Sequence, residues 1–274
     1  FLKSELFWRI ISGLVLAPIV VFATWWGGVV FAALAAIASA LIIREWMRLV
    51  GEPLIWVEFA CMALIWLAIA ALVLNFRAIG FGLLGVGAAI ALMGGKPWVA
   101  LGIAYGGLAA LSLVALRGHG MQGFYDPGFI AIVFVLMAVW STDVMAYFVG
   151  RLVGGPKLWP RVSPNKTWSG AIGGFVAAII VATGICWLLE VRPLWPLAVI
   201  AGILSVAGQL GDLFESHMKR KFGLKDSGHL IPGHGGIMDR VDGLIFAAVA
   251  AMAIGLLHAG PLAPAVGLLN WGQP

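Results

Sequence analysis

Apolar segments long enough to cross a lipid bilayer recur from one end of this chain to the other. Hydrophobic residues make up 62% of the 274 residues, and charged residues make up only 11%. A water-soluble domain of this length needs more charge than this to cover its surface. The sequence therefore predicts an all-α fold, a polytopic transmembrane helical bundle of about nine spans.

Nine spans place the two chain termini on opposite sides of the membrane. The segments 28–43 and 79–94 are short, so they require helix tilt or local thinning of the bilayer. The spans are expected near residues 10–26, 28–43, 56–74, 79–94, 98–116, 129–149, 170–189, 194–211 and 241–258.

The basic residues favour one orientation of these spans. With a cytoplasmic N-terminus, fourteen of the 17 Lys and Arg residues fall on the cytoplasmic side, and only Arg77, Arg117 and Arg192 fall on the other. This bias follows the positive-inside rule, and it explains the net charge of +5 without a nucleic-acid partner. We expect a multi-pass protein of the plasma (inner) membrane with its active site facing the cytoplasm.

Polar residues concentrate in the second half of the chain. We expect residues 1–116 to form an N-terminal transmembrane scaffold. Residues 117–274 then form a C-terminal catalytic region with cytoplasmic polar loops at 150–169 and 212–240. Cys61 and Cys186 lie in separate apolar segments, which favours two buried hydrophobic side chains over a disulfide or a metal site.

The first polar motif is G-D-L-F-E-S-H-M-K-R, at the end of the eighth predicted span. If the helix continues there, Asp212, Glu215, Ser216 and Lys219 share one face at i, i+3, i+4 and i+7. Carboxylates and an ammonium group on one face would bind a metal ion and a phosphate together. The alternative is an ordinary salt-bridged helix end at the membrane interface.

The second motif, I-P-G-H-G-G-I-M-D-R-V-D-G, runs into the last predicted span. Its glycines permit unusual backbone angles and a close approach of main-chain N–H groups to an anion. Asp239 and Asp242 are one helical turn apart at the start of the span. Ionisable residues at a membrane entry point are costly unless they are paired or used, so we interpret them as functional.

The third motif lies between residues 141 and 174. Asp143 falls inside the sixth span, where an acid is a functional candidate or is hydrogen-bonded between helices. The segment S-P-N-K-T, just before a helix, predicts a phosphate-binding loop, with a capped basic loop as the alternative. Its polar side chains are Ser163, Asn165, Lys166 and Thr167.

These motifs together resemble a known family. The segment Ser216–Asp242, with S-x-x-K-R, K-D, P-G-H-G-G and D-R-x-D, resembles the signature of phosphatidate cytidylyltransferases, the CDP-diacylglycerol synthases. The upstream D-x-x-A-Y-x-x-G and S-P-x-K-T are also similar to that family. Specific motifs cover residues 130–258, and residues 1–116 share hydropathy and the segment R-E-W-x-R-L, Arg44–Leu49.

The resemblance implies an enzyme, a nucleotidyltransferase that converts CTP and phosphatidic acid into CDP-diacylglycerol and pyrophosphate in phospholipid biosynthesis. It implies Mg²⁺, because acids and water are hard oxygen ligands, and it leaves a second cation open. The expected partners are CTP, phosphatidic acid and membrane lipid, without nucleic acid, and a homodimer is left open.

Three groups of site residues follow from the motifs and the resemblance. The catalytic group, which includes the cations that would neutralise substrate charge, is Lys219, Arg220, Lys225, Asp226 and Arg240. The substrate-binding group is Ser163, Asn165, Lys166, Thr167, Ser216, Gly233, His234, Gly235 and Gly236. The metal-binding group is Asp212, Asp239, Asp143 and Asp242.

Two other classes of function are alternatives to this one. An ion or metabolite transporter would spread acids through several spans, in repeated halves, whereas the charges here collect on one face. Another metal-dependent phospholipid transferase is the second alternative. The D-G-x-x-A-R motif of CDP-alcohol phosphotransferases is absent from the sequence, and polyprenyl-phosphate transferases remain open.

Overall fold

The computed structural model describes residues 16–52, 54–120, 122–228 and 235–272. These residues form helices, apart from one two-stranded antiparallel hairpin of β1 (Lys157–Trp159) and β2 (Ser163–Thr167). The all-α prediction is confirmed. Within the described residues, seven helices are long and apolar enough to cross a membrane: α2 (Gly28–Leu49), α3 (Ile55–Val73), α5 (Pro97–Arg117), α6 (Pro127–Val153), α7 (Trp168–Leu188), α8 (Leu194–Lys221) and α9 (Met238–Ala259).

Two shorter apolar helices occupy the other predicted spans. They are Leu16–Trp26 and α4 (Arg77–Met93). Each predicted span therefore overlaps an apolar helix in the described part of the chain, the first span from Leu16 onward, and seven of these helices meet the length of a span by themselves. The multi-pass membrane character of the chain follows from these helices.

Three helices extend well beyond their predicted ends. α2 ends at Leu49, α6 at Val153 and α8 at Lys221, whereas the predicted ends were 43, 149 and 211. Hydropathy stops at the last apolar residue, whereas a helix continues wherever polar side chains one turn apart support it. The short helix α10 (Pro264–Leu269) and the hairpin were not predicted, because neither has a long apolar segment.

The chain divides into two compact units, each described here by itself. Unit 1 comprises Phe1–Gly123 and Lys221–Val241, and unit 2 comprises Phe124–Arg220 and Asp242–Pro274. The divisions fall within α8 and α9, so each of these helices contributes residues to both units.

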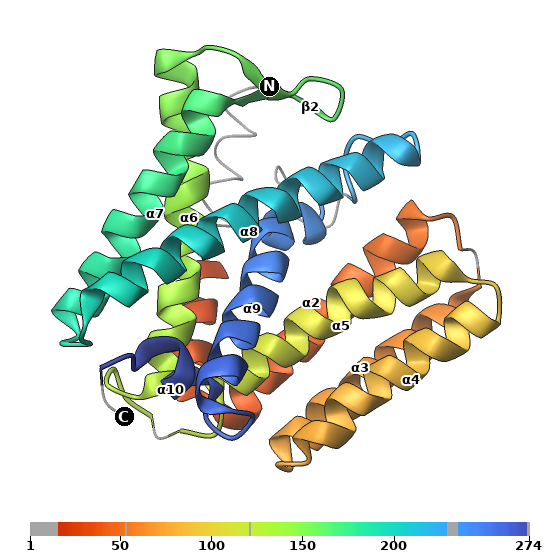
Figure 1. The fold of residues 1–274 in the computed structure, drawn as a ribbon. Helices are drawn as coiled ribbons and strands as arrows, with labels where there is room; N and C mark the ends of the chain where they lie inside the picture. The colour runs from red at the N-terminus through yellow and green to blue at the C-terminus, as the bar shows by residue number, and fades with distance from the viewer. Residues whose placement is uncertain (1–15, 53, 121, 229–234, 273–274) are drawn as a thin grey trace. The chain divides into compact units, whose positions relative to one another are not determined.

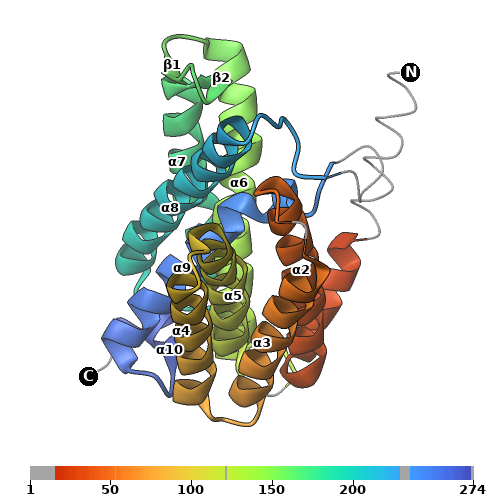
Figure 2. The ribbon, with the colours of Figure 1, turned by 90° about the vertical axis from the view of Figure 1, so that its right-hand side faces the viewer.

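Unit 1 contains α2, α3, α4 and α5. Figures 1 and 2 both show α3 and α4 side by side. The Trp46 side chain is fully buried, its indole N–H donates to the Trp98 carbonyl at 2.8 Å, and its ring lies 5.1 Å from that of Tyr105. A β-carbon added at Gly102 would lie 2.4 Å from the Trp46 ring. A glycine in α5 thus makes room for the largest buried side chain of α2.

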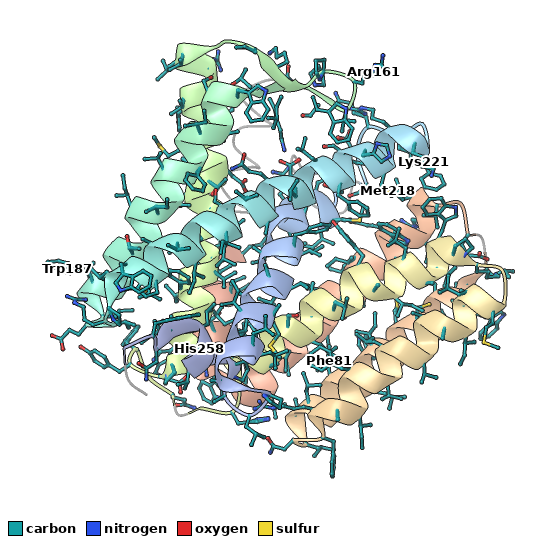
Figure 3. The ribbon with its side chains drawn as sticks, viewed as in Figure 1. Phe81, Arg161, Trp187, Met218, Lys221 and His258 are labelled. Carbon is teal, nitrogen blue, oxygen red and sulfur yellow. The ribbon has the colours of Figure 1, made fainter. Side chains whose placement is uncertain are left out.

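Unit 2 contains the closely packed pair α6 and α7. A β-carbon added at Gly170 would lie 2.6 Å from the Ala146 carbonyl oxygen, and one at Gly174 would lie 2.6 Å from that of Thr142. Small residues of this kind let helix backbones approach each other within a membrane. Exposed tryptophans lie at both ends of α7, as expected for anchors at the two membrane interfaces: Trp168 at the start and Trp187 near the end. Figure 3 labels Trp187.

Candidate functional site

Glycines bring the polar ends of α8 and α9 together in unit 2. A β-carbon added at Gly211 would lie 2.5 Å from the carbonyl oxygen of Asp242, and one at Gly208 would lie 3.5 Å from that of Gly243. The two backbones therefore cross almost in contact. Asp212 follows Gly211 directly, so the crossing places its side chain near Asp242.

Four carboxylates gather near this crossing: Asp143, Asp212, Glu215 and Asp242, called the acidic cluster below. Asp242 lies against Glu215 and within electrostatic range of Asp212 and Asp143. Three of the four predicted metal-binding residues are therefore brought together in unit 2. Glu215, which the first motif places on the same helix face as Asp212 but which the predicted metal-binding group omits, joins them.

The acidic cluster offers oxygen atoms only, which suits a hard cation such as Mg²⁺. Among the described residues, no three His, Cys, Asp or Glu side chains are arranged to hold a metal ion by themselves. Mg²⁺ usually keeps several waters and takes only one or two protein carboxylates together with substrate phosphates. The donor set therefore fits this ion, and Mg²⁺ stays a prediction.

Two lysines neutralise part of the acidic cluster. Lys166 forms an ion pair with Asp212, and Lys219 pairs with Glu215, its neighbour one turn earlier in α8, at 3.4 Å. The Ser216 hydroxyl donates to Asp212 at 3.4 Å. Because α8 continues to Lys221, the four polar residues of the first motif interact along one helix as the spacing predicts.

The S-P-N-K-T segment is strand β2 rather than a loop. Figure 3 shows Arg161 in the connection between β1 and β2. Thr167 is the N-cap of α7, and its hydroxyl accepts from the Gly170 N–H at 3.1 Å. The Trp168 N–H donates to the Pro156 carbonyl. These first-turn amides are used within the fold, so Lys166 is the segment's clearest link to the acidic cluster.

A second group of polar residues lies in unit 1 at the start of α9. Asp239 accepts hydrogen bonds from the Ser227 N–H at 3.1 Å, the Ser227 hydroxyl at 2.9 Å and the Gly236 N–H at 2.9 Å. These three contacts hold Ser227 and Gly236 against the first turn of α9. A carboxylate at a helix N-terminus is also favoured by the helix dipole.

Glu45, on α2, completes this group and was not predicted as a site residue. It is only 3% exposed, and it accepts from the Ile237 N–H at 2.9 Å and the Met238 N–H at 2.8 Å. Its Oε2 atom also lies 3.0 Å from the Ser227 hydroxyl, whose one proton is shared between Glu45 and Asp239. Glu45, Ser227 and Asp239 are called the anchor cluster below. Glu45 shares a helix face with the buried residues Ile42 and Leu49, and this spacing was the available signal.

Comparison with known proteins gives the family. Residues 7–258 match the model of the Cytidylyltransferase family. The chain belongs to the cytidylyltransferase family. The phosphatidate cytidylyltransferase of Brucella abortus is 43% identical over 265 residues, which cover 94% of this chain and 96% of that protein. The phosphatidate cytidylyltransferase of Staphylococcus haemolyticus is 46% identical over 140 residues, 50% of this chain and 54% of that protein.

In this cytidylyltransferase-family chain, the other predicted site residues lie at the surface or outside the described residues. Asn165, Arg220, Lys225, Asp226 and Arg240 are exposed, and Ser163 is half-buried. Gly235 has a positive φ of 82°, which favours glycine. Gly233 and His234 lie outside the described residues.

Asp212 and Asp239 belong to different units of this cytidylyltransferase-family chain. Their joint role in metal binding stays a prediction. The Gly236 N–H, expected to face a substrate phosphate, donates here to Asp239. Substrate binding by Gly235 and Gly236 likewise stays a prediction.

Proposed function

We propose that this protein transfers CMP from CTP to phosphatidic acid, giving CDP-diacylglycerol and pyrophosphate. The observation that carries the proposal is the 43% identity, over nearly the full length of both chains, to a protein named phosphatidate cytidylyltransferase. The acidic cluster with its two lysines, on helices long enough to cross a membrane, supports it. A lipid with a phosphate head group and a soluble nucleotide would meet at such a site.

The reaction needs no nucleophile from the protein. A phosphate oxygen of phosphatidic acid forms a bond to the α-phosphorus of CTP. The bond from that phosphorus to the oxygen bridging to the β-phosphorus breaks, and its electron pair leaves with pyrophosphate. Such phosphoryl transfers depend on alignment of the two oxygens and on neutralisation of charge.

The residues of unit 2 supply this neutralisation. Lys166 and Lys219 carry ammonium groups on flexible stems, and each rests on a carboxylate, where a substrate phosphate can compete for it. Asp212 and Asp242 would hold Mg²⁺, which supplies charge stabilisation on the phosphate oxygens when bound. Arg220, which is exposed near the C-terminal end of α8, would attract the anionic substrates.

The membrane orientation is part of the proposal. The bias of fourteen basic residues to three supports a cytoplasmic site in the plasma (inner) membrane, the compartment that contains CTP. A cysteine introduced at Gln273 should react with a membrane-impermeant thiol reagent added outside the cytoplasm. Reaction only from the cytoplasmic side would contradict the nine-span topology. The homodimer stays a prediction, testable by light scattering in detergent.

The activity is tested with purified protein, Mg²⁺, phosphatidic acid and CTP labelled at its α-phosphate. We expect label in a CDP-lipid, with one pyrophosphate released per lipid formed. Label transferred to another lipid acceptor would indicate a different phospholipid transferase, and transport of solute into vesicles without a lipid product would indicate a transporter. The Asp126→Asn variant, an α6 N-cap that keeps an equally good cap, is the matched control for changes in the acidic cluster.

A further inference from the structure

Glu45 is a buried carboxylate whose described hydrogen-bond partners all come from one distant segment. Those partners, Ser227, Ile237 and Met238, lie 182 to 193 residues further along the chain. Burial of a carboxylate is costly unless hydrogen bonds replace the lost water. Ser227, Ile237 and Met238 supply these bonds, so the position of Glu45 and the positions of these three residues depend on each other.

The glycines of the signature fit against Glu45. A β-carbon added at Gly236 would lie 2.1 Å from the Ser227 hydroxyl oxygen and 2.4 Å from Glu45 Oε2, closer than any real contact. A β-carbon at Gly228 would lie 3.0 Å from Glu45 Oε1. The G-G step therefore lets the backbone reach the carboxylate of α2, which is a packing requirement separate from phosphate binding.

Ser227 connects Glu45 to Asp239. Its hydroxyl lies 3.0 Å from Glu45 Oε2 and 2.9 Å from Asp239 Oδ2, and its N–H also donates to Asp239. Glu45 holds the Ile237 and Met238 amides, which immediately precede Asp239 in the first turn of α9. The Asp239 side chain is thus located from two directions, through Ser227 and through the α9 backbone.

We infer that Glu45 is a positioning residue of the reaction: it places Asp239 and the first turn of α9 by anchoring Ser227 and the α9 amides. The catalytic part of this inference rests on the proposed function. The anchoring part is a property of the protein alone, and it can be measured without substrate.

The anchoring is tested by hydrogen exchange on the full-length protein in detergent. In Glu45→Gln, an isosteric change that removes the charged acceptor, the amides of residues 237 and 238 should exchange about tenfold faster or more. Glu58→Gln is the matched control, because Glu58 lies in the same unit and makes a 4.0 Å ion pair with Arg44 instead. Unchanged protection in Glu45→Gln would overturn the inference, whatever reaction the protein catalyses.

The catalytic role is tested by kcat, KM and Tm together. Misplacement of a reacting group by about 1 Å lowers rates about 10²-fold, so Glu45→Gln should lose about that much kcat while KM for phosphatidic acid changes less than threefold. Glu45→Asp keeps both acceptor oxygens at a shorter reach and should recover part of kcat. A loss of Tm with normal kcat in the folded protein would make Glu45 merely structural and overturn the positioning role. Absence of any CDP-lipid from the unmodified protein would contradict the proposed function instead.

Discussion

The anchor cluster and the acidic cluster both contain buried or half-buried carboxylates, but the groups that pair with these carboxylates differ. In the anchor cluster, Glu45 and Asp239 accept from backbone amides and from Ser227. In the acidic cluster, Asp212 and Glu215 pair with lysine ammonium groups. Amide donors are fixed by the fold, whereas a lysine can rotate towards a phosphate without movement of the backbone. The anchor cluster fixes the position of the first turn of α9. The acidic cluster holds lysine ammonium groups that can leave their carboxylates and bind a substrate phosphate.

The largest combined effect is expected for Asp239→Asn. The change replaces one carboxylate oxygen by an N–H donor beside three donors, so it should lower the free energy of unfolding by about 1–3 kcal/mol. Turnover should also be lost, because Asp239 is a predicted metal ligand. Thermal unfolding and CDP-lipid formation measure the two effects. Normal Tm together with normal turnover would remove Asp239 from both roles.

Asp212→Asn should separate activity from stability. Its described partners, Lys166 and Ser216, are side chains at a partly exposed position, and such contacts contribute little to folding. We expect turnover to fall by at least about 10²–10³ while Tm stays within a few degrees of the unmodified protein. Near-normal activity at saturating Mg²⁺ would show that Asp212 is no metal ligand, and a Tm loss as large as that of Asp239→Asn would erase the contrast between the clusters.

Two lysines, two residues apart at the end of α8, test the acidic cluster more finely. Lys219 pairs with Glu215, whereas the Lys221 ammonium lies 4.2 Å from the centre of the Trp98 ring in unit 1. Figure 3 shows Lys221 at the end of α8. Removal of one preorganised charge donor typically lowers rates about 10²–10³-fold. We expect that loss in kcat/KM for Lys219→Ala and a change below threefold for Lys221→Ala.

The same assay needs a check on folding, because Glu215 is fully buried and loses its ammonium partner in Lys219→Ala. Lys219→Arg keeps the charge and should retain the Tm of the unmodified protein. Equal, small rate losses for the two alanine variants would make this an ordinary basic helix end.

Hydropathy predicted the helices well, and residue spacing predicted the polar face of α8. Both signals are local: an apolar span needs only its own residues, and contacts one turn apart need only a continuous helix. The hairpin and α10 carry neither signal, and they were missed for that reason.

The anchor cluster could not be predicted as a group, because its members lie on α2 and on either side of the start of α9, far apart in the sequence. Glu45 follows an apolar span and precedes Arg48, so it resembles one more charge at a membrane interface. Its spacing with Ile42 and Leu49 indicates a buried helix face, but only the fold shows that its carboxylate binds Ser227, Ile237 and Met238. The glycines of P-G-H-G-G were interpreted as a place where main-chain N–H groups approach a substrate phosphate. Sequence alone does not distinguish a backbone that approaches a phosphate from one that packs against the carboxylate of Glu45.

The smallest effect is expected for Thr167→Ala, which tests how the S-P-N-K-T segment acts. Sequence spacing assigns Thr167 to substrate phosphate, whereas its hydroxyl here caps α7 by accepting from Gly170. Loss of such a cap typically lowers stability by about 1 kcal/mol, so Tm should fall while KM for CTP stays unchanged. Thr167→Ser keeps the hydroxyl and should match the unmodified protein in both measurements. A tenfold rise in KM for CTP at constant Tm would instead mean that the hydroxyl leaves its cap to bind the nucleotide. Thr167 would then resemble Lys166 and Lys219, which are proposed to change partner when substrate binds, rather than Glu45, whose contacts are fixed by the fold.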